Sequence, residues 1–201
     1  MTELMKFDER IIADHGRIAG LDEAGRGALA GPVFVGCLSV PVNMLREGDL
    51  SSVNDSKQLS GEIRNELFDR LANKEGVGLG IGMARSGEVD KFGINDAADM
   101  AASRALSALC IEASLALLDK GLSPALGVPA RELEKGDERS FHVAGASILA
   151  KVSRDRYMRL KAGEFEEYGW ASNVGYGTEE HRKSIDRYGL SPLHRKSYKI
   201  T

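Results

Sequence analysis

Two adjacent carboxylates, Asp22 and Glu23, follow an apolar run at residues 18–21 and precede a Gly-Arg-Gly segment at residues 25–27. Successive side chains of a strand point to opposite faces, so two acids that share one task require the strand to end between them. The glycines permit the turn that this needs. Carboxylates beside an arginine and exposed backbone N–H groups are typical of a site that holds a hard cation next to a phosphate.

Two other interpretations compete for this segment. A polar hairpin turn would leave both acids merely solvated. Residues 25–30 also match the Gly-x-Gly-x-x-Ala form of the dinucleotide-binding fingerprint. Pro32 and the β-forming residues after it argue against the helix that this fingerprint requires, and two carboxylates would repel a pyrophosphate. The cation site is therefore favoured over both.

Two further acids stand at the end of a predicted strand or at a polar corner, Asp119 after an apolar run and Asp137 after Lys135-Gly136. Four convergent carboxylates would hold two divalent cations, and Mg2+ prefers such oxygen ligands. In a two-metal site one ion lowers the pKa of the attacking water while the other stabilises the leaving oxygen. This chemistry needs neither a histidine base nor a covalent nucleophile.

Hydrophobic spacing predicts the elements that position these acids. A short lead-in precedes the first strand, and a loop is expected from residue 41 to about residue 60. Glycines within 77–83 indicate close packing against a neighbouring backbone. Residues 115–118 either continue the preceding helix or form a strand, and the strand is favoured. Strands are predicted at 18–21, 33–40 (long enough to be central), 77–83, 115–118 and 130–133, and helices at 60–71, 95–110, 144–162 and 179–188.

Composition indicates one globular domain, because 42% of the 201 residues are hydrophobic and 28% are charged. No apolar run reaches the length of a membrane span and the start lacks the plan of a signal peptide, so a cytoplasmic protein is expected. Cys37 and Cys110 lie in apolar stretches and are expected to be reduced core residues. The net charge is −3, yet residues 151–201 carry 11 Lys and Arg against 7 Asp and Glu, which suits phosphate binding.

Four motifs in series resemble one known family: Leu-Asp-Glu-Ala-Gly-Arg-Gly through Ala-Gly-Pro at 21–32, Asn-Asp-Ser-Lys-Gln-Leu-Ser at 54–60, Ala-Ser-Ile-Leu-Ala-Lys-Val-Ser-Arg-Asp at 146–155 and Gly-Tyr-Gly-Thr at 175–178. In this order and spacing the chain resembles ribonuclease HII, the type 2 ribonuclease H. The resemblance implies an α/β fold with a ribonuclease H-like mixed sheet flanked by helices. Residues 1–162 would form the catalytic core, and residues 163–201 a helical C-terminal extension packed on it.

The implied activity is endonucleolytic cleavage, dependent on Mg2+ or Mn2+, that leaves 3′-hydroxyl and 5′-phosphate ends. Its substrates would be the RNA strand of RNA–DNA hybrids and duplex DNA with embedded ribonucleotides, cut on their 5′ side. The resemblance implies four catalytic, metal-binding carboxylates: Asp22, Glu23, Asp119 and Asp137. It also implies a segment that recognises the 2′-hydroxyl, where glycine lets backbone groups approach closely: Gly25, Arg26 and Gly27.

Further substrate contacts are implied on three other segments. Tyr176 would stack on the sugar of the following deoxynucleotide, although a tyrosine in isolation is more simply a half-buried surface residue. The implied phosphate contacts are Lys57, Ser147 and Lys151. Ser147 and Lys151 share a helix face with Arg154 and Asp155, for which a solvated surface is the alternative, and Asp155 is expected to pair with a nearby Arg or Lys.

The sequence departs from the family pattern in three places. Lys120 follows Asp119 where glycine is usual and puts metal affinity in doubt. Residues 172–174 replace a usual His-Lys stretch and remove a basic contact. Gly145 is expected to loosen the start of its helix.

Three expectations concern what the chain is not. A sister type, ribonuclease HIII, carries an added N-terminal substrate-binding domain, for which about twenty residues before Asp22 leave no room. A non-catalytic nucleic-acid-binding module would be expected to lose one of the four carboxylates, and all four are present. A monomer is expected, because no extra apolar face is visible in the sequence.

Overall fold

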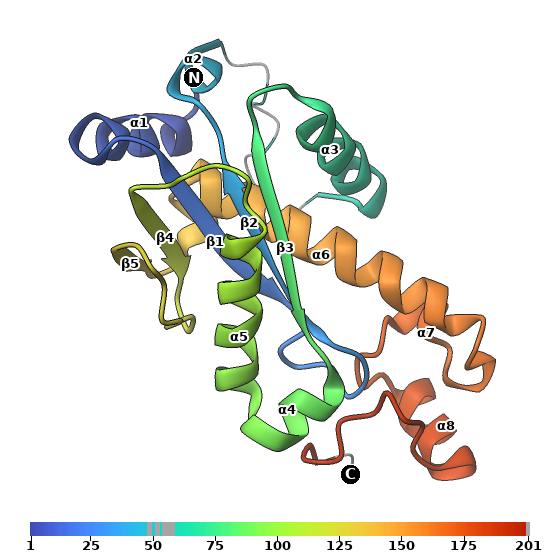
Figure 1. Ribbon diagram of the computed structural model, residues 1–201. Coiled ribbons are helices and arrows are strands. Elements are labelled where there is room, and N and C mark those ends of the chain that lie inside the picture. The colour runs from blue at the N-terminus through green and yellow to red at the C-terminus, as the bar shows by residue number, and fades with distance from the viewer. Residues whose placement is uncertain (48–49, 51–52, 54–58, 200–201) are drawn as a thin grey trace.

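The computed structural model describes residues 1–47, 50, 53 and 59–199, and its centre is a five-stranded sheet in the order β3-β2-β1-β4-β5 (Figure 1). β2 pairs antiparallel with both β1 and β3. β4 runs parallel to both β1 and β5. The predicted mixed sheet is confirmed, with strands β1 (Ile18–Ala24), β2 (Val33–Ser39), β3 (Gly78–Ala84), β4 (Leu115–Asp119) and β5 (Ala130–Leu133).

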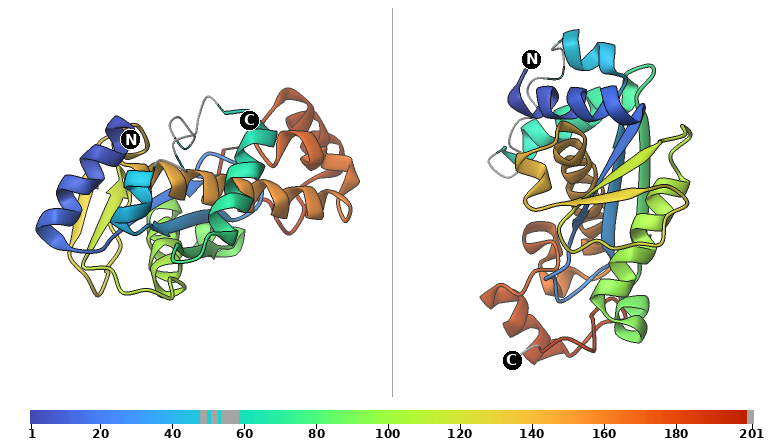
Figure 2. Two further views of the ribbon diagram at one scale, coloured as in Figure 1. Left: turned by 90° about the horizontal axis from the view of Figure 1, so that it is seen from above. Right: turned by 90° about the vertical axis from the view of Figure 1, so that its left-hand side faces the viewer.

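Helices cover both faces of the sheet (Figure 2). α5 (Ile94–Ser107) packs on β2 and β3 from one side, whereas α6 (Phe141–Ala162) crosses β1 and β2 on the other. Among the described residues, no helix combines the length and the apolar character needed to cross a membrane. The remaining helices are α1 (Glu3–His15), α2 (Val42–Glu47), α3 (Gly61–Asn73), α4 (Ser86–Phe92), α7 (Trp170–Asn173) and α8 (Glu179–Tyr188).

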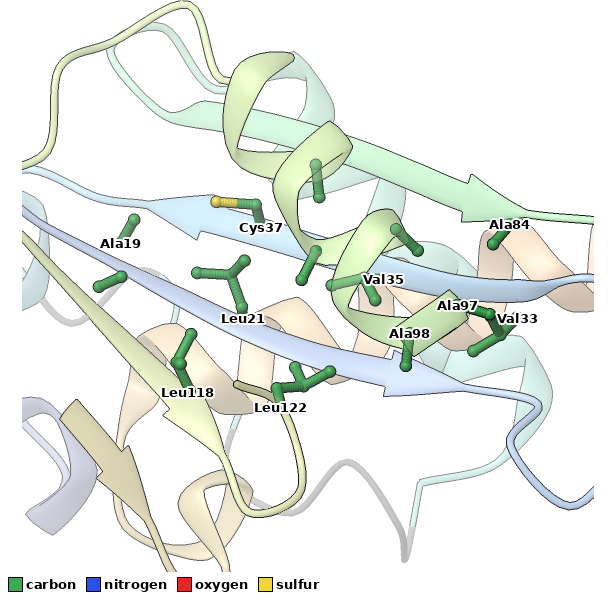
Figure 3. Close-up of a cluster of buried hydrophobic side chains, with 14 of the residues drawn as sticks. Ala19, Leu21, Val33, Val35, Cys37, Ala84, Ala97, Ala98, Leu118 and Leu122 are labelled. Carbon is green, nitrogen blue, oxygen red and sulfur yellow. The ribbon is translucent and has the colours of Figure 1, made fainter. Parts of the chain in front are cut away.

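The sheet face under α5 is built for a close helix. Leu21, Val35 and Cys37 point from β1 and β2 into a core that the alanines of α5 complete (Figure 3). A Cβ at Gly80 or Gly82 would lie 2.0 Å from a carbonyl oxygen of α5. Only glycine therefore lets the helix backbone approach β3 this closely, and the close packing expected from the glycines is confirmed.

On the opposite face, α6 begins at Phe141, three residues before its predicted start. Ser140 is the N-cap, and its hydroxyl accepts a hydrogen bond from Val143 N at 3.3 Å. The buried Asp8 of α1 accepts a second from His142 N at 2.9 Å. A carboxylate at this position satisfies an otherwise orphaned N–H group and offsets the positive end of the helix dipole. The long-range contact from α1 thus fixes where α6 starts.

Several local predictions are wrong. The lead-in is the helix α1, the expected loop after residue 40 starts with α2, and α4 was not expected. Cys110 is exposed, because α5 ends at Ser107 and leaves this cysteine in the following loop. Gly145 also has a packing role that was not expected: a Cβ there would lie 2.2 Å from Leu38 Cδ2, so this glycine allows α6 to pack against β2.

The segment after α6 folds back on the core and surrounds Trp170 with a polar network. Trp170 Nε1 donates to His181 Nε2 at 3.0 Å, and His194 Nε2 lies 3.1 Å from the same atom. His181 Nδ1 lies 2.9 Å from the Tyr176 carbonyl oxygen, and His194 Nδ1 accepts from Ser191 N at 2.9 Å. These partners fit two neutral imidazoles, because a proton on His181 Nε2 would face two other donors. Burial lowers the pKa of His181, and burial with the adjacent His181 lowers the pKa of His194 to about 4.

We expect this network to make the C-terminal segment sensitive to acid. Both histidines have a folded-state pKa below the unfolded value, so the stability they confer is complete above about pH 6.5 and is lost as the pH falls towards about 4. For His194 the loss between pH 6.5 and 5 is about 2 kcal/mol. Trp170 is the only tryptophan in the sequence, and it can report the loss as a lower urea midpoint followed by fluorescence.

His194→Asn is the variant that tests this expectation, and the same change at a histidine outside the network is the matched control. His194→Asn keeps an oxygen that can accept from Ser191 N and removes the titrating group, so its midpoint should depend less on pH than that of the parent. The same change at the exposed His15 should leave the pH dependence intact. An unaltered dependence in His194→Asn would contradict the assignment of the acid sensitivity to this residue.

Candidate active site

Asp22, Glu23 and Asp119 meet where β1 extends beyond β4. The two strands pair only as far as Leu21, so the edge of β1 past this residue is open to side chains. One carboxylate oxygen from each acid lies within 4.8 Å of the other two. β1 continues to Ala24, so the prediction that the strand ends between the adjacent acids is wrong. Their side chains leave opposite faces and converge around the open edge instead.

The electrostatics of this cluster are unfavourable without a cation. Asp22 is 5% exposed. Its burial, followed by the charges of Glu23 and Asp119, raises the pKa of its carboxyl well above the usual value, against the opposing effect of a hydrogen bond from Ser147. Among the described residues, no group donates to the buried Glu23 Oε2. A divalent cation fits this donor set, because it would offset the repulsion and supply the missing partner.

Asp137 stands beside the cluster, on the turn that follows β5. This turn is η1 (Gly136–Glu138), and Asp137 is 3% exposed there. Asp119 Oδ1 accepts a hydrogen bond from Gly136 N at 2.7 Å, which ties the turn to the end of β4. The structure therefore brings three of the predicted ligands together and places the fourth on an adjoining turn, outside the 4.8 Å group.

The side chain of Arg26 joins three other segments of the protein. Its Nε donates to Glu23 Oε1 at 2.9 Å, Nη1 to Asn95 Oδ1 at 2.7 Å and Nη2 to the Gly121 carbonyl at 2.9 Å. These bonds hold the Glu23 carboxylate and connect the ends of β1, α5 and β4. Asn95 acts here without any signal in the sequence, since its partner lies 69 residues away.

Gly25 and Gly27 are glycine for different reasons. Gly25 has φ +93°, and a Cβ there would lie 1.9 Å from Arg154 Nε. Arg154 is fully buried and donates to the carbonyls of Ala30, Pro32 and Val174. At the exposed Gly27 nothing lies within 4 Å of a Cβ position. The fold requires the first glycine, whereas the second leaves room for a molecule from outside.

A cavity of about 410 Å³ opens beside the acids. It is lined by seven of the predicted site residues, namely Glu23, Gly25, Arg26, Gly27, Ser147, Lys151 and Tyr176. Arg64 of α3 lines it too and was not predicted, because a single arginine on the polar face of a helix gives no signal. Ser147 and Lys151 are half-buried, so a fully solvated helix face is not what α6 presents. Lys57 lies outside the described residues.

Tyr176 is presented by an unusual turn. Val174 adopts φ +43°, which is strained for a β-branched residue. Asn173 closes the turn, with its Oδ1 accepting from Gly175 N at 2.8 Å. The guanidinium of Arg154 lies 5.1 Å from the centre of the Tyr176 ring. The residues that replace the usual His-Lys stretch therefore shape the backbone that carries this tyrosine.

Lys120 and Asp155, two charged residues whose roles the sequence left open, both form ion pairs. Lys120 Nζ lies 3.1 Å from Glu134 Oε1, so its charge is shared with a carboxylate outside the acidic cluster. Asp155 accepts from Lys151 Nζ at 2.9 Å, which confirms the expected structural pairing.

The mixed sheet, the acids gathered at the adjoining ends of β1 and β4 and the similarity to a solved ribonuclease H2 together identify the class as nucleases of the ribonuclease H-like fold. The crystal structure of ribonuclease H2 from Pyrococcus horikoshii OT3 is similar, with a TM-score of 0.74 and 25% identity over 92% of this chain and 94% of that one. The fold is also that of Bst-RNase HIII in complex with Mn2+, which has a TM-score of 0.72 and 18% identity over 92% and 67% of the two chains.

The sequence comparisons agree with this class. The family model of ribonuclease HII matches residues 19–201. Ribonuclease HII of Syntrophotalea carbinolica is 42% identical over 195 residues, which are 96% of this chain and 90% of that protein. The chain belongs to the ribonuclease HII family. It is a metal-dependent nuclease with ribonuclease H activity, and the resemblance drawn from its four motifs is confirmed.

Proposed function

We propose that the protein is an endonuclease that cuts the RNA strand of RNA–DNA hybrids and cuts 5′ to single ribonucleotides embedded in duplex DNA, leaving 3′-hydroxyl and 5′-phosphate ends. The observation that carries the proposal is the position of the three clustered acids beside the cavity lined by residues 25–27 and Tyr176. Acids that can hold cations thus adjoin groups that can recognise a sugar hydroxyl. We propose further that it acts as a monomer in the cytoplasm.

Asp22, Glu23, Asp119 and Asp137 would hold two Mg2+ or Mn2+ ions. When bound, divalent cations at such a site activate the attacking water and stabilise the leaving oxygen. The protein's own groups supply orientation. Arg26 holds Glu23 through its Nε, and the Gly136 N–H holds Asp119. Both carboxylates are therefore aimed before substrate arrives, which lowers the reorganisation needed for reaction.

The cavity supplies recognition. Arg64 of α3 and Lys151 of α6 both line it and place positive charge where phosphates of a bound strand would pass. The open space at Gly27 lets the backbone approach a 2′-hydroxyl, which both donates and accepts hydrogen bonds. The Tyr176 ring offers a flat face on which the next sugar can stack, and a second 2′-hydroxyl there would disturb that contact.

Cleavage of an end-labelled DNA duplex that contains one ribonucleotide tests the proposal. We expect cutting 5′ to the ribonucleotide with Mg2+ or Mn2+, no cutting with chelator, and an intact all-DNA duplex. A long RNA–DNA hybrid should also be cut. Cutting of the hybrid alone would contradict recognition at the junction, and no cutting of either substrate with either metal would contradict the metal site.

Tyr176→Ala should lower kcat/KM on the single-ribonucleotide duplex by about tenfold, since loss of a stacking contact costs about 1–3 kcal/mol. The loss on a long hybrid should be smaller, because most of its sugars carry a 2′-hydroxyl. Tyr188→Ala is the matched control, at a tyrosine that is 52% exposed on α8. Equal losses for Tyr176→Ala on both substrates would contradict a junction role.

A further inference from the structure

The C-terminal segment packs against the 25–27 loop and the residues that follow it. Arg195 N donates to the Leu29 carbonyl at 2.9 Å, and Arg195 Nε donates to the Gly31 carbonyl at 3.0 Å. Ala30 and His194 form an isolated antiparallel bridge. This part of the chain is more than 160 residues away in sequence, yet it packs directly against the residues that follow the loop. Its contacts continue to the backbone of the loop itself.

Two donors converge on a single carbonyl of that loop. The Tyr198 hydroxyl donates to the Arg26 carbonyl oxygen at 2.6 Å, and Arg195 Nη1 donates to the same oxygen at 2.8 Å. Arg195 Nη1 also donates to the Tyr198 hydroxyl oxygen at 3.1 Å, so the three groups form a closed set. Arg195 is fully buried, and a charged donor in such surroundings makes a strong hydrogen bond.

Holding this carbonyl fixes the next amide. The Arg26–Gly27 peptide bond is trans, and in a trans peptide the C=O and the following N–H point in opposite directions. The Arg26 carbonyl points down to Arg195 and Tyr198, so the Gly27 N–H points away from them. Gly27 is exposed there and lines the cavity beside the acids.

We propose that Arg195 and Tyr198 are positioning residues for ribonucleotide recognition: they lock the Arg26–Gly27 peptide with the Gly27 N–H directed at the 2′-hydroxyl. The inference rests on the proposed function, in which the 25–27 loop meets the ribonucleotide. Glycine at position 27 is flexible in isolation, and without these two donors its peptide could rotate. The C-terminal segment thereby sets how strongly the enzyme distinguishes a ribonucleotide from a deoxynucleotide.

Tyr198→Phe tests the proposal, because it removes the hydroxyl and keeps the ring that packs on the core. We would measure kcat and KM on a duplex with one ribonucleotide, and the inhibition constant of the uncut all-DNA duplex of the same sequence. We expect KM for the ribonucleotide duplex to rise about fivefold, as for loss of one hydrogen bond of about 1 kcal/mol, with the all-DNA inhibition constant unchanged.

Ser197→Ala is the matched control in the same segment. It removes a hydrogen bond from Ser197 Oγ to Asp90 Oδ1 of 2.8 Å, which does not involve the loop. In this variant, the ratio of KM for the ribonucleotide duplex to the inhibition constant of the all-DNA duplex should equal that of the parent. The proposal would be overturned if Tyr198→Phe left the ratio of KM to the all-DNA inhibition constant unchanged. It would also be overturned if Ser197→Ala raised this ratio as much as Tyr198→Phe does. A parent enzyme that does not distinguish the two duplexes would instead contradict the proposed function.

Discussion

Asp22→Asn should lower the rate of cleavage of a single-ribonucleotide duplex by about a thousandfold or more. The acid lies at the centre of the cluster with Glu23 and Asp119, and loss of a metal-binding carboxylate removes several kcal/mol of transition-state stabilisation. The fold should persist, because the amide oxygen of Asn can still accept the 2.7 Å hydrogen bond from Glu23 N. Asp137→Asn should have the same effect on cleavage. Full activity in Asp22→Asn would contradict the metal site.

Asp22→Asn should also raise the melting temperature of the metal-free protein at neutral pH. The pKa of Asp22 is raised by burial and by its acidic neighbours, so its charged form opposes folding. This penalty is complete above the folded-state pKa and disappears below the unfolded value of 3.8. The gain in Asp22→Asn should therefore vanish at low pH. Asp186→Asn, at an exposed acid of α8, is the control and should show no such gain.

Gly25→Ala should destabilise the protein by about 3 kcal/mol or more, which for a chain of this size lowers the melting temperature by roughly 10 °C. The new Cβ would lie 1.9 Å from Arg154 Nε, and φ is +93°. Arg154 cannot move aside cheaply, because its guanidinium satisfies three buried carbonyls. Thermal unfolding of the variant measures the effect, and a melting temperature within 2–3 °C of the parent, a shift of about 1 kcal/mol, would contradict this account.

Gly27→Ala is the matched variant two residues along. Its Cβ meets no protein atom within 4 Å, so the melting temperature should stay close to that of the parent. Cleavage of the single-ribonucleotide duplex should nevertheless fall by about tenfold, since the methyl group would occupy space that the substrate needs. Unchanged cleavage in Gly27→Ala would show that the loop does not approach the ribonucleotide at this residue.

Much of the fold could be predicted from local pattern. All five strands and the helices α3, α5, α6 and α8 follow from apolar spacing and caps, and the strand assignment of residues 115–118 is confirmed. The start of α6 and the existence of α1 could not be predicted in this way. The buried Asp8 links the two helices across 134 residues, and a polar residue on an otherwise amphipathic segment does not reveal such a partner.

The family, the four candidate metal ligands and the glycines of the loop could be identified from the sequence, because they depend on residue type and order. How these residues are used depends on tertiary packing, which the structure reveals. The structure shows that Asp22 and Glu23 converge around an open strand edge, and that Arg154 and Arg195 are buried supports of the loop. The reason is physical: a carboxylate or guanidinium is recognisable in a sequence, but its desolvation and its partners depend on packing between segments far apart in the chain.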